Sequence, residues 1–140
     1  MSQKPISLLI LAFSLVLTTA ITAQEMTPEQ VVQKQLEAYN ERDIDGFMST
    51  IAENVTFHNF SDGRLTIKGF TACREFYAAL FEASPNLHST ILTRTIFGNK
   101  VIDHERIIGR NGNDDVLELV LVYEVINTKI TKVTVLRKEE

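Results

Sequence analysis

The segment spanning residues 101–108 holds the densest group of ionisable side chains in an otherwise apolar stretch of this 140-residue chain. In an extended strand, alternate side chains point to opposite faces, so Asp103 and Glu105 share one face while His104 and Arg106 share the other. Two carboxylates about 7 Å apart along a strand repel each other and raise the pKa of one of them. A carboxylate with a raised pKa can act as a general base. Asp103 and Glu105 are therefore the first candidates for catalytic residues.

The same two carboxylates have a structural alternative. Pairs of opposite charge across neighbouring strands are common in sheets, and Arg94 and Arg137 lie in predicted strands. Strand alternation does not tell which face of the segment is concave. The residues alone thus leave two hypotheses open, a general base in a pocket and a ladder of ion pairs.

Other kinds of site are disfavoured. The three histidines show no tight ligand spacing, so no metal site is expected, and no glycine-rich phosphate loop or nucleophile elbow is present. We therefore expect no cofactor. With 14 Lys and Arg against 18 Asp and Glu, the net charge of −4 disfavours nucleic acid as a partner. A single cysteine excludes an internal disulfide framework.

The N-terminal segment has the three parts of a secretory signal. Lys4 precedes an apolar run over residues 6–17, and small residues follow up to Ala23. We expect cleavage after Ala23 or Ala20, with residues 1–23 as the signal and 24–140 as one domain. An uncleaved membrane anchor is the alternative, although the apolar centre is shorter than the roughly 20 residues that a span needs. The mature protein is then exported to the periplasm or cell exterior, without a stable membrane span.

The rest of the chain predicts three helices and six strands. Thr27 to Gln30 form a capping box for a first helix ending near residues 40–42, and Asp43 can cap a short second helix with apolar residues up to Ile51. A third helix is expected over about residues 71–83. Strands are expected over residues 55–60, 65–67, 88–97, 101–110, 116–126 and 130–137. Helices grouped before a meander of strands indicate an α+β fold with helices on one sheet face.

The predicted strand over residues 116–126 is the most apolar strand of the chain. One face carries only apolar and aromatic side chains: Leu117, Leu119, Leu121, Tyr123 and Val125. We expect this face to meet the helices. The opposite face still presents Val120 and Val122, which a partner subunit would cover in a homodimer. Edge valines left in water are the alternative.

These segments together resemble a known family. The stretch from Val31 to Phe47, the strand Val55 to His58, Gly69 with Arg74 to Tyr77, and the closing Tyr123 to Ile130 look like the SnoaL-like branch of the nuclear transport factor 2-like superfamily. The resemblance covers nearly all of the mature chain. It implies a curved antiparallel sheet wrapped around three helices, forming a cone with a pocket at its open end. It also implies a homodimer through the outer sheet face.

The resemblance also implies which positions line the pocket. Ketosteroid isomerase, which has this shape, uses a carboxylate base and two hydrogen-bond donors. The base position falls on Asn59, the tyrosine donor of the first helix falls on Gln35, and the protonated-acid donor falls near Leu121. Only Tyr77 keeps a matching residue. We therefore do not expect ketosteroid isomerisation.

The resulting hypothesis is a pocket for a small, partly apolar molecule. Because the resemblance turns the Asp103 and Glu105 face into the cone, one of these carboxylates would be the base, with Tyr77 and Asn59 as donors. The remaining expected ligand-binding residues are the aromatic ones near the mouth, namely Tyr39, Phe57 and Tyr123. Isomerase, cyclase or hydrolase chemistry would fit such a pocket. The alternative is a non-catalytic binding or dimerisation domain.

Overall fold

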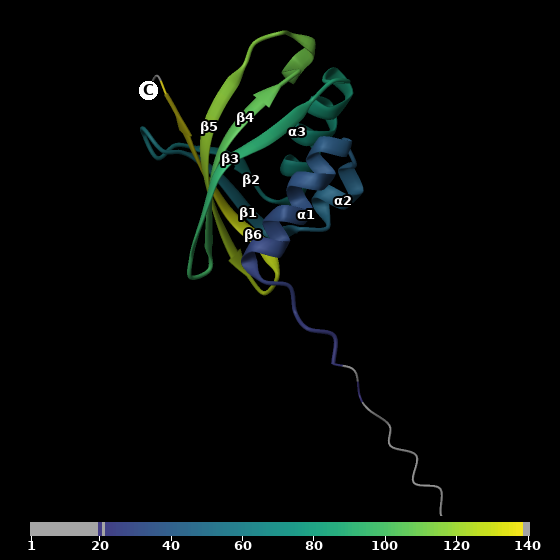
Figure 1. Ribbon diagram of the computed structural model, residues 1–140, viewed down its shortest axis with the longest axis vertical. Helices are drawn as coiled ribbons and strands as arrows, with labels where there is room; N and C mark the ends of the chain where they lie inside the picture. The colour runs from purple at the N-terminus through teal and green to yellow at the C-terminus, as the bar shows by residue number, and fades with distance from the viewer. Residues whose placement is uncertain (1–19, 21, 139–140) are drawn as a thin grey trace, which may run out of the picture.

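A computed structural model describes residue 20 and residues 22–138 (Figure 1). The predicted secretory signal, residues 1–23, therefore lies mostly outside the described residues. Among the helices of the described part of the chain, none is long and apolar enough to cross a membrane. Residues 28–137 form a single sheet that carries the helices on one side (Figure 1).

Two consecutive helices open the domain. Helix α1 (Pro28–Glu41) begins with the expected capping box between Thr27 and Gln30, which satisfies backbone N–H groups that the first turn leaves unpaired. Helix α2 (Ile44–Met48) begins at Asp43, whose side chain accepts a hydrogen bond from the backbone of Gly46. The prediction that Ile51 belongs to this second helix was wrong, because the backbone is already extended there and Ile51 starts the first strand.

Six strands form one sheet in the order β2-β1-β6-β5-β4-β3. Their bounds are β1 (Ile51–Asn59), β2 (Leu65–Lys68), β3 (His88–Phe97), β4 (Lys100–Ile108), β5 (Leu117–Ile126) and β6 (Lys129–Arg137). All neighbours are antiparallel except β1 and β6, which run parallel. The last strand of the chain thus lies beside the first, inside an open sheet whose edge strands are β2 and β3.

The sheet is curved and does not close into a barrel, and the three helices lie on its concave side (Figure 1). Irregular register in β1, in β3 between Ile91 and Thr93, and in β5 between Glu124 and Val125 supplies bends, because a bulge increases local twist. The apolar face of β5 turns toward the helices as expected, with Leu119, Tyr123 and Val125 all buried. This α+β cone is the fold that the sequence predicted.

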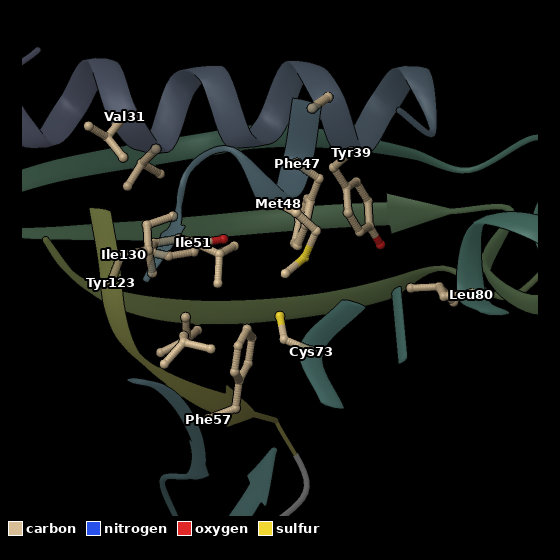
Figure 2. Packing of buried hydrophobic residues seen from close by; sticks show 14 of the residues in the cluster. Val31, Tyr39, Phe47, Met48, Ile51, Phe57, Cys73, Leu80, Tyr123 and Ile130 are labelled. Carbon is tan, nitrogen blue, oxygen red and sulfur yellow. The ribbon is translucent and has the colours of Figure 1, made fainter. Parts of the chain in front are cut away.

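Helix α3 (Phe70–Ala83) completes the interior with aromatic side chains. The Tyr77 and Phe47 ring centroids lie 4.2 Å apart, and Phe81 packs edge-on against Tyr39 at 5.6 Å. Figure 2 shows the Tyr39 ring projecting from α1 into the space between the helix and the sheet, beside Phe47. Stacked and edge-to-face rings bury large apolar areas, so this cluster joins all three helices.

Strand β4 ends earlier than predicted. It stops at Ile108, and Arg110 begins the short 3-10 helix η1 (Arg110–Gly112) instead of ending the strand. The cause is Gly109, which has a φ of 73° and lies against the α3–β3 connection. A Cβ atom there would sit 2.2 Å from the backbone oxygen of Asn86, so only glycine fits. This turn moves Arg110 out of the strand.

Candidate functional site

A pocket of about 200 Å³ lies between the concave face of the sheet and helices α1 and α3. It is lined by Gln35, Leu36, Tyr39, Phe57, Thr66, Ile67, Phe76, Tyr77, Glu105, Ile107, Arg110, Leu119, Leu121, Tyr123, Val133, Val135 and Arg137. Most of these side chains are apolar or aromatic, and a few polar groups converge among them. Such a composition is typical of small-molecule sites.

Glu105 is the acidic residue in the pocket wall. Its side chain projects from the concave face of β4, and the residue is only 4% exposed. One carboxyl oxygen accepts a hydrogen bond from the Ser89 hydroxyl at 2.8 Å, and the other from the Tyr123 hydroxyl at 3.1 Å. Burial raises the pKa of Glu105 to about 7, because desolvation outweighs these two hydrogen bonds. The carboxyl therefore exchanges a proton near neutral pH.

Ser89 is held in place by a second contact. The Asn40 side-chain amide donates to the backbone oxygen of Ser89 at 3.0 Å, and its oxygen accepts from the Ser89 backbone N–H at 2.7 Å. This pair fastens the end of α1 to the start of β3. The Ser89 hydroxyl is thereby oriented toward Glu105, so Asn40 is a positioning residue for the site.

Asp103, the other predicted base, is engaged elsewhere. It is 1% exposed, does not line the pocket, and accepts two hydrogen bonds from the Arg94 guanidinium at 2.7 and 2.8 Å. Arg94 also donates to the side chain of Gln33 on α1. Of the two hypotheses, the ion pair across neighbouring strands thus applies to Asp103. Asp103 is not placed to act as a general base in the pocket. Its charge still contributes to the raised pKa of Glu105.

Three tyrosines surround the interior of the pocket. The Tyr39 hydroxyl is fully buried and has no hydrogen-bond partner among the described residues. Burial raises the pKa of Tyr39 to about 12, with the charge of Arg110 opposing this rise. Burial also raises the pKa of both Tyr77 and Tyr123 far above the usual range. All three phenols therefore stay protonated at neutral pH and can act as hydrogen-bond donors.

The predicted ligand-binding residues divide into two groups. Tyr39, Phe57 and Tyr123 line the pocket, as does the predicted donor Tyr77. Asn59 does not, since it lies at the end of β1, where its side-chain oxygen accepts a hydrogen bond from Arg137. The expectation that Asn59 binds ligand is therefore corrected, because the strand places it beyond the pocket lining.

Sequence reasoning missed two contributors. Ser89 supplies a hydrogen bond to Glu105, and Arg110 brings a guanidinium to the pocket lining. Gln35, which the resemblance placed at the donor position of the first helix, contributes a buried amide to the wall. Gln35 and Tyr39 are one helical turn apart, so the helical period was a usable signal for the pair. No comparable signal existed for Ser89, because its partner lies on another strand.

Metal and thiol chemistry find little support within residues 22–138. No group of three or more histidine, cysteine, aspartate or glutamate side chains there could hold a metal ion. The single cysteine, Cys73, is buried in the core, and burial raises the pKa of its thiol to about 12. A thiol in this state is a poor nucleophile. The proton-exchanging group of the pocket is the Glu105 carboxyl.

The sequence profile of the SnoaL-like domain matches residues 32–133. This chain belongs to the SnoaL-like family. The match contains all the pocket residues except Val135 and Arg137, as well as most of the sheet. No curated protein sequence matches the chain significantly.

Solved structures similar to this SnoaL-like protein share its fold. A cystatin-fold protein from Novosphingobium aromaticivorans superposes with a TM-score of 0.73 at 22% identity, covering 81% of this chain and 100% of the other. An NTF2-like protein from Cytophaga hutchinsonii gives 0.66 at 18% identity, covering 81% and 92%. A protein of ketosteroid isomerase-like fold from Catenulispora acidiphila, solved with trimethylamine, gives 0.64 at 18%, covering 79% and 85%. Identities this low establish the fold alone.

Proposed function

We propose that this SnoaL-like protein is a cofactor-free acid–base enzyme that moves a proton on a small, partly apolar molecule, with Glu105 as the general base. The observation that carries the proposal is a buried carboxyl in the wall of a mostly apolar pocket, with a pKa of about 7. A general base works best when its pKa lies near the working pH. The reaction class is isomerase, cyclase or hydrolase chemistry that begins with proton abstraction.

The carboxyl is held in a fixed orientation. Ser89 and Tyr123 donate to its two oxygens, so the plane of the carboxyl is set by two strands, β3 and β5. Each carboxyl oxygen has further lone-pair capacity, which leaves an acceptor site for a substrate C–H or O–H group. Preorganisation of this kind lowers the cost of reaching a reactive geometry.

Tyr77 is the proposed donor to the oxygen on which negative charge develops. Its side chain lines the same pocket, and no hydrogen bond joins its hydroxyl to another described residue. The charge of Glu105 contributes to its raised pKa, so the two groups interact electrostatically. A protonated phenol in a water-poor pocket stabilises a developing oxyanion more strongly than water does.

Two measurements test the proposal. The first is a carbon NMR titration of the Glu105 carboxyl, assigned by its loss in Glu105→Gln. The second is deuterium uptake from D₂O by phenylacetone, a small apolar ketone with an acidic CH₂ group. We expect a midpoint near pH 7 and accelerated exchange, which Glu105→Gln abolishes while Glu118→Gln, on the outer face, does not. A midpoint near 4.5 contradicts the proposal.

The alternative function is non-catalytic binding of a small molecule in the same pocket. The Tyr39 hydroxyl favours it, because a buried donor without a protein partner suits a bound ligand as well as a reacting one. Titration of Glu105 near pH 7 without any acceleration of exchange would select this alternative.

We also propose that the protein is exported after cleavage of residues 1–23. The support is the order of Lys4, the apolar run and the small residues before Gln24.

A homodimer through the outer face of the sheet is the third proposal. Val120 and Leu136 are cross-strand neighbours there and are only partly covered, as is Val122 on the next row. A rim of polar side chains, in which His104 and Lys138 both contact Glu118, flanks these apolar residues. An apolar centre with a polar rim is the usual anatomy of a subunit interface.

A further inference from the structure

We propose that the pocket binds a small aromatic or apolar molecule carrying one carboxylate or similar anionic oxygen group, which Arg110 and Tyr39 hold. This inference deepens the proposed function and uses the same pocket. It concerns the group by which the ligand is anchored and does not depend on what Glu105 does to it.

Arg110 is a cation built into the pocket lining. The residue is half-buried, no carboxylate among the described residues forms an ion pair with it, and its guanidinium interacts with the Tyr39 hydroxyl. A guanidinium that is partly removed from water and has no counter-ion favours an anion, which it can bind through two parallel N–H groups. The lining of this pocket thus offers a site for a carboxylate.

The backbone around Arg110 is fixed. Gly109 lies against the backbone of Asn86, and the backbone N–H of Asn111 donates to the buried Ser84 hydroxyl at 2.8 Å. These contacts hold η1 against the end of α3, so the Arg110 Cα has a defined position. The guanidinium therefore approaches the pocket from a rigid turn, which reduces the entropy lost on binding.

Tyr39 supplies the second half of the anchor. Its hydroxyl is buried without a partner, an arrangement that costs free energy unless another group satisfies the O–H. The positive charge of Arg110 acts on this hydroxyl, so an anion held by Arg110 lies close to a phenol that can donate to it. Gln35, one turn earlier on α1, adds a buried amide to the same wall.

The charge pattern of the pocket sets the orientation of the ligand. Asp103 and Arg94 are the charged side chains that most affect Glu105, whereas Arg110 acts on Tyr39 and Tyr77. An anionic group of the ligand is thereby attracted to Arg110, on the side of the pocket where this cation acts on Tyr39 and Tyr77. The apolar body of the ligand then extends toward Glu105, which places its carbon atoms near the proposed base.

The size of the cavity limits the ligand to about one substituted ring. Its volume is about 200 Å³. An apolar cavity of roughly 150 Å³ accommodates benzene, and pockets for drug-sized ligands start at roughly 300 Å³. The neighbouring walls are Leu36, Phe57 and Tyr77, which suit the faces and edges of an aromatic ring.

Benzoate and benzamide provide a test, because they share ring and shape but differ in charge. Their dissociation constants are measured by NMR titration of the purified protein. We expect benzoate to bind at least tenfold more tightly than benzamide. Arg110→Gln should lower benzoate affinity at least tenfold and leave benzamide unchanged, whereas Tyr39→Phe should give a severalfold loss for benzoate. The control Arg106→Gln removes the same charge from the outer face and should change neither.

The outcomes separate this inference from the proposed function. Equal affinity for the two probes, no saturable benzoate binding, or an equal effect of Arg106→Gln overturns the anion anchor. The titration of Glu105 near pH 7 and the exchange of phenylacetone are unaffected by such a result. Conversely, selective benzoate binding with a Glu105 midpoint near 4.5 supports the anchor and removes the proposed base.

Discussion

Asp103 and Glu105 lie two residues apart on the same face of β4, yet only Glu105 lines the pocket. Both carboxyl oxygens of Asp103 accept hydrogen bonds from the Arg94 guanidinium, whereas Glu105 accepts hydrogen bonds only from neutral hydroxyl groups. A full opposite charge compensates the burial of one carboxylate, and the other is left with uncompensated desolvation. The two acidic residues thus differ in role: Asp103 forms a structural ion pair, and Glu105 is suited to proton exchange.

The raised pKa of Glu105 predicts a stability that falls with rising pH. The folded protein holds a proton on Glu105 up to about pH 7, whereas an unfolded glutamate loses it near 4.5. This contribution is fully present below pH 4.5 and is lost as the pH rises through 7. Between these limits the wild type should lose about 3 kcal/mol relative to Glu105→Gln, measured by urea unfolding at several pH values.

The control for this experiment has the opposite sign. Lys138 and His104 lower the pKa of Glu118, so its contribution is present above the unfolded pKa and declines as the pH falls. Relative to Glu118→Gln, the wild type should therefore show no loss of unfolding free energy as the pH approaches 7. A wild type and Glu105→Gln pair with parallel pH profiles would contradict the raised pKa.

Replacing Ser89 should raise the pKa of Glu105 further. The hydroxyl donates to the carboxylate and favours its charged form, and it opposes desolvation more than the Tyr123 hydroxyl does. Ser89→Ala should therefore move the NMR midpoint of Glu105 upward, and Tyr123→Phe should move it upward by less. Thr90→Ala, at the next residue and exposed, should leave it in place. An unchanged midpoint in Ser89→Ala would show that the hydrogen bond has no influence.

The Arg94–Asp103 pair should matter for stability. Removing the charge of Asp103 leaves a largely buried guanidinium without its partner, and breaking such a pair costs on the order of 3 kcal/mol. Asp103→Asn should lower the free energy of unfolding by this amount in a urea titration. The matched control is Asp45→Asn, which breaks the exposed pair with Arg74 and should cost about 0.5 kcal/mol. Equal losses in the two variants would contradict the structural role of Asp103.

A charge at the centre of the outer sheet face should weaken the proposed homodimer. Val120→Lys places an ammonium among Val122, Leu136 and their copies, where it loses hydration on association. Sedimentation velocity of the purified protein should shift toward the monomer. Asn113→Lys adds the same charge in an exposed loop and should leave the value unchanged. An identical sedimentation coefficient for both variants and the wild type would rule out this interface.

Export can be checked by the N-terminus of the secreted protein. Cleavage after Ala23 gives a chain beginning at Gln24, and cleavage after Ala20 gives one beginning at Ile21. Intact-mass measurement of the protein from the periplasm or medium distinguishes these two. A membrane-bound chain that retains Met1 would indicate the anchor instead.

The sequence alone determined the elements and the fold class. The capping box at Thr27 and the strand alternation of β5 depend on residues close in the chain, so local rules predict them. The same alternation put Asp103 and Glu105 on one face. Alternation within one strand carries no information about the neighbouring strands, so it did not distinguish the roles of Asp103 and Glu105.

Only the tertiary structure decided which side chains meet. Arg94 lies opposite Asp103 because of the register between β3 and β4, and Ser89 reaches Glu105 because Asn40 fastens α1 to β3. Gly109 turns Arg110 out of its predicted strand and into the pocket lining. The pKa of a carboxyl depends on how far it is removed from water and on what surrounds it there, and both are properties of the packed sheet and helices.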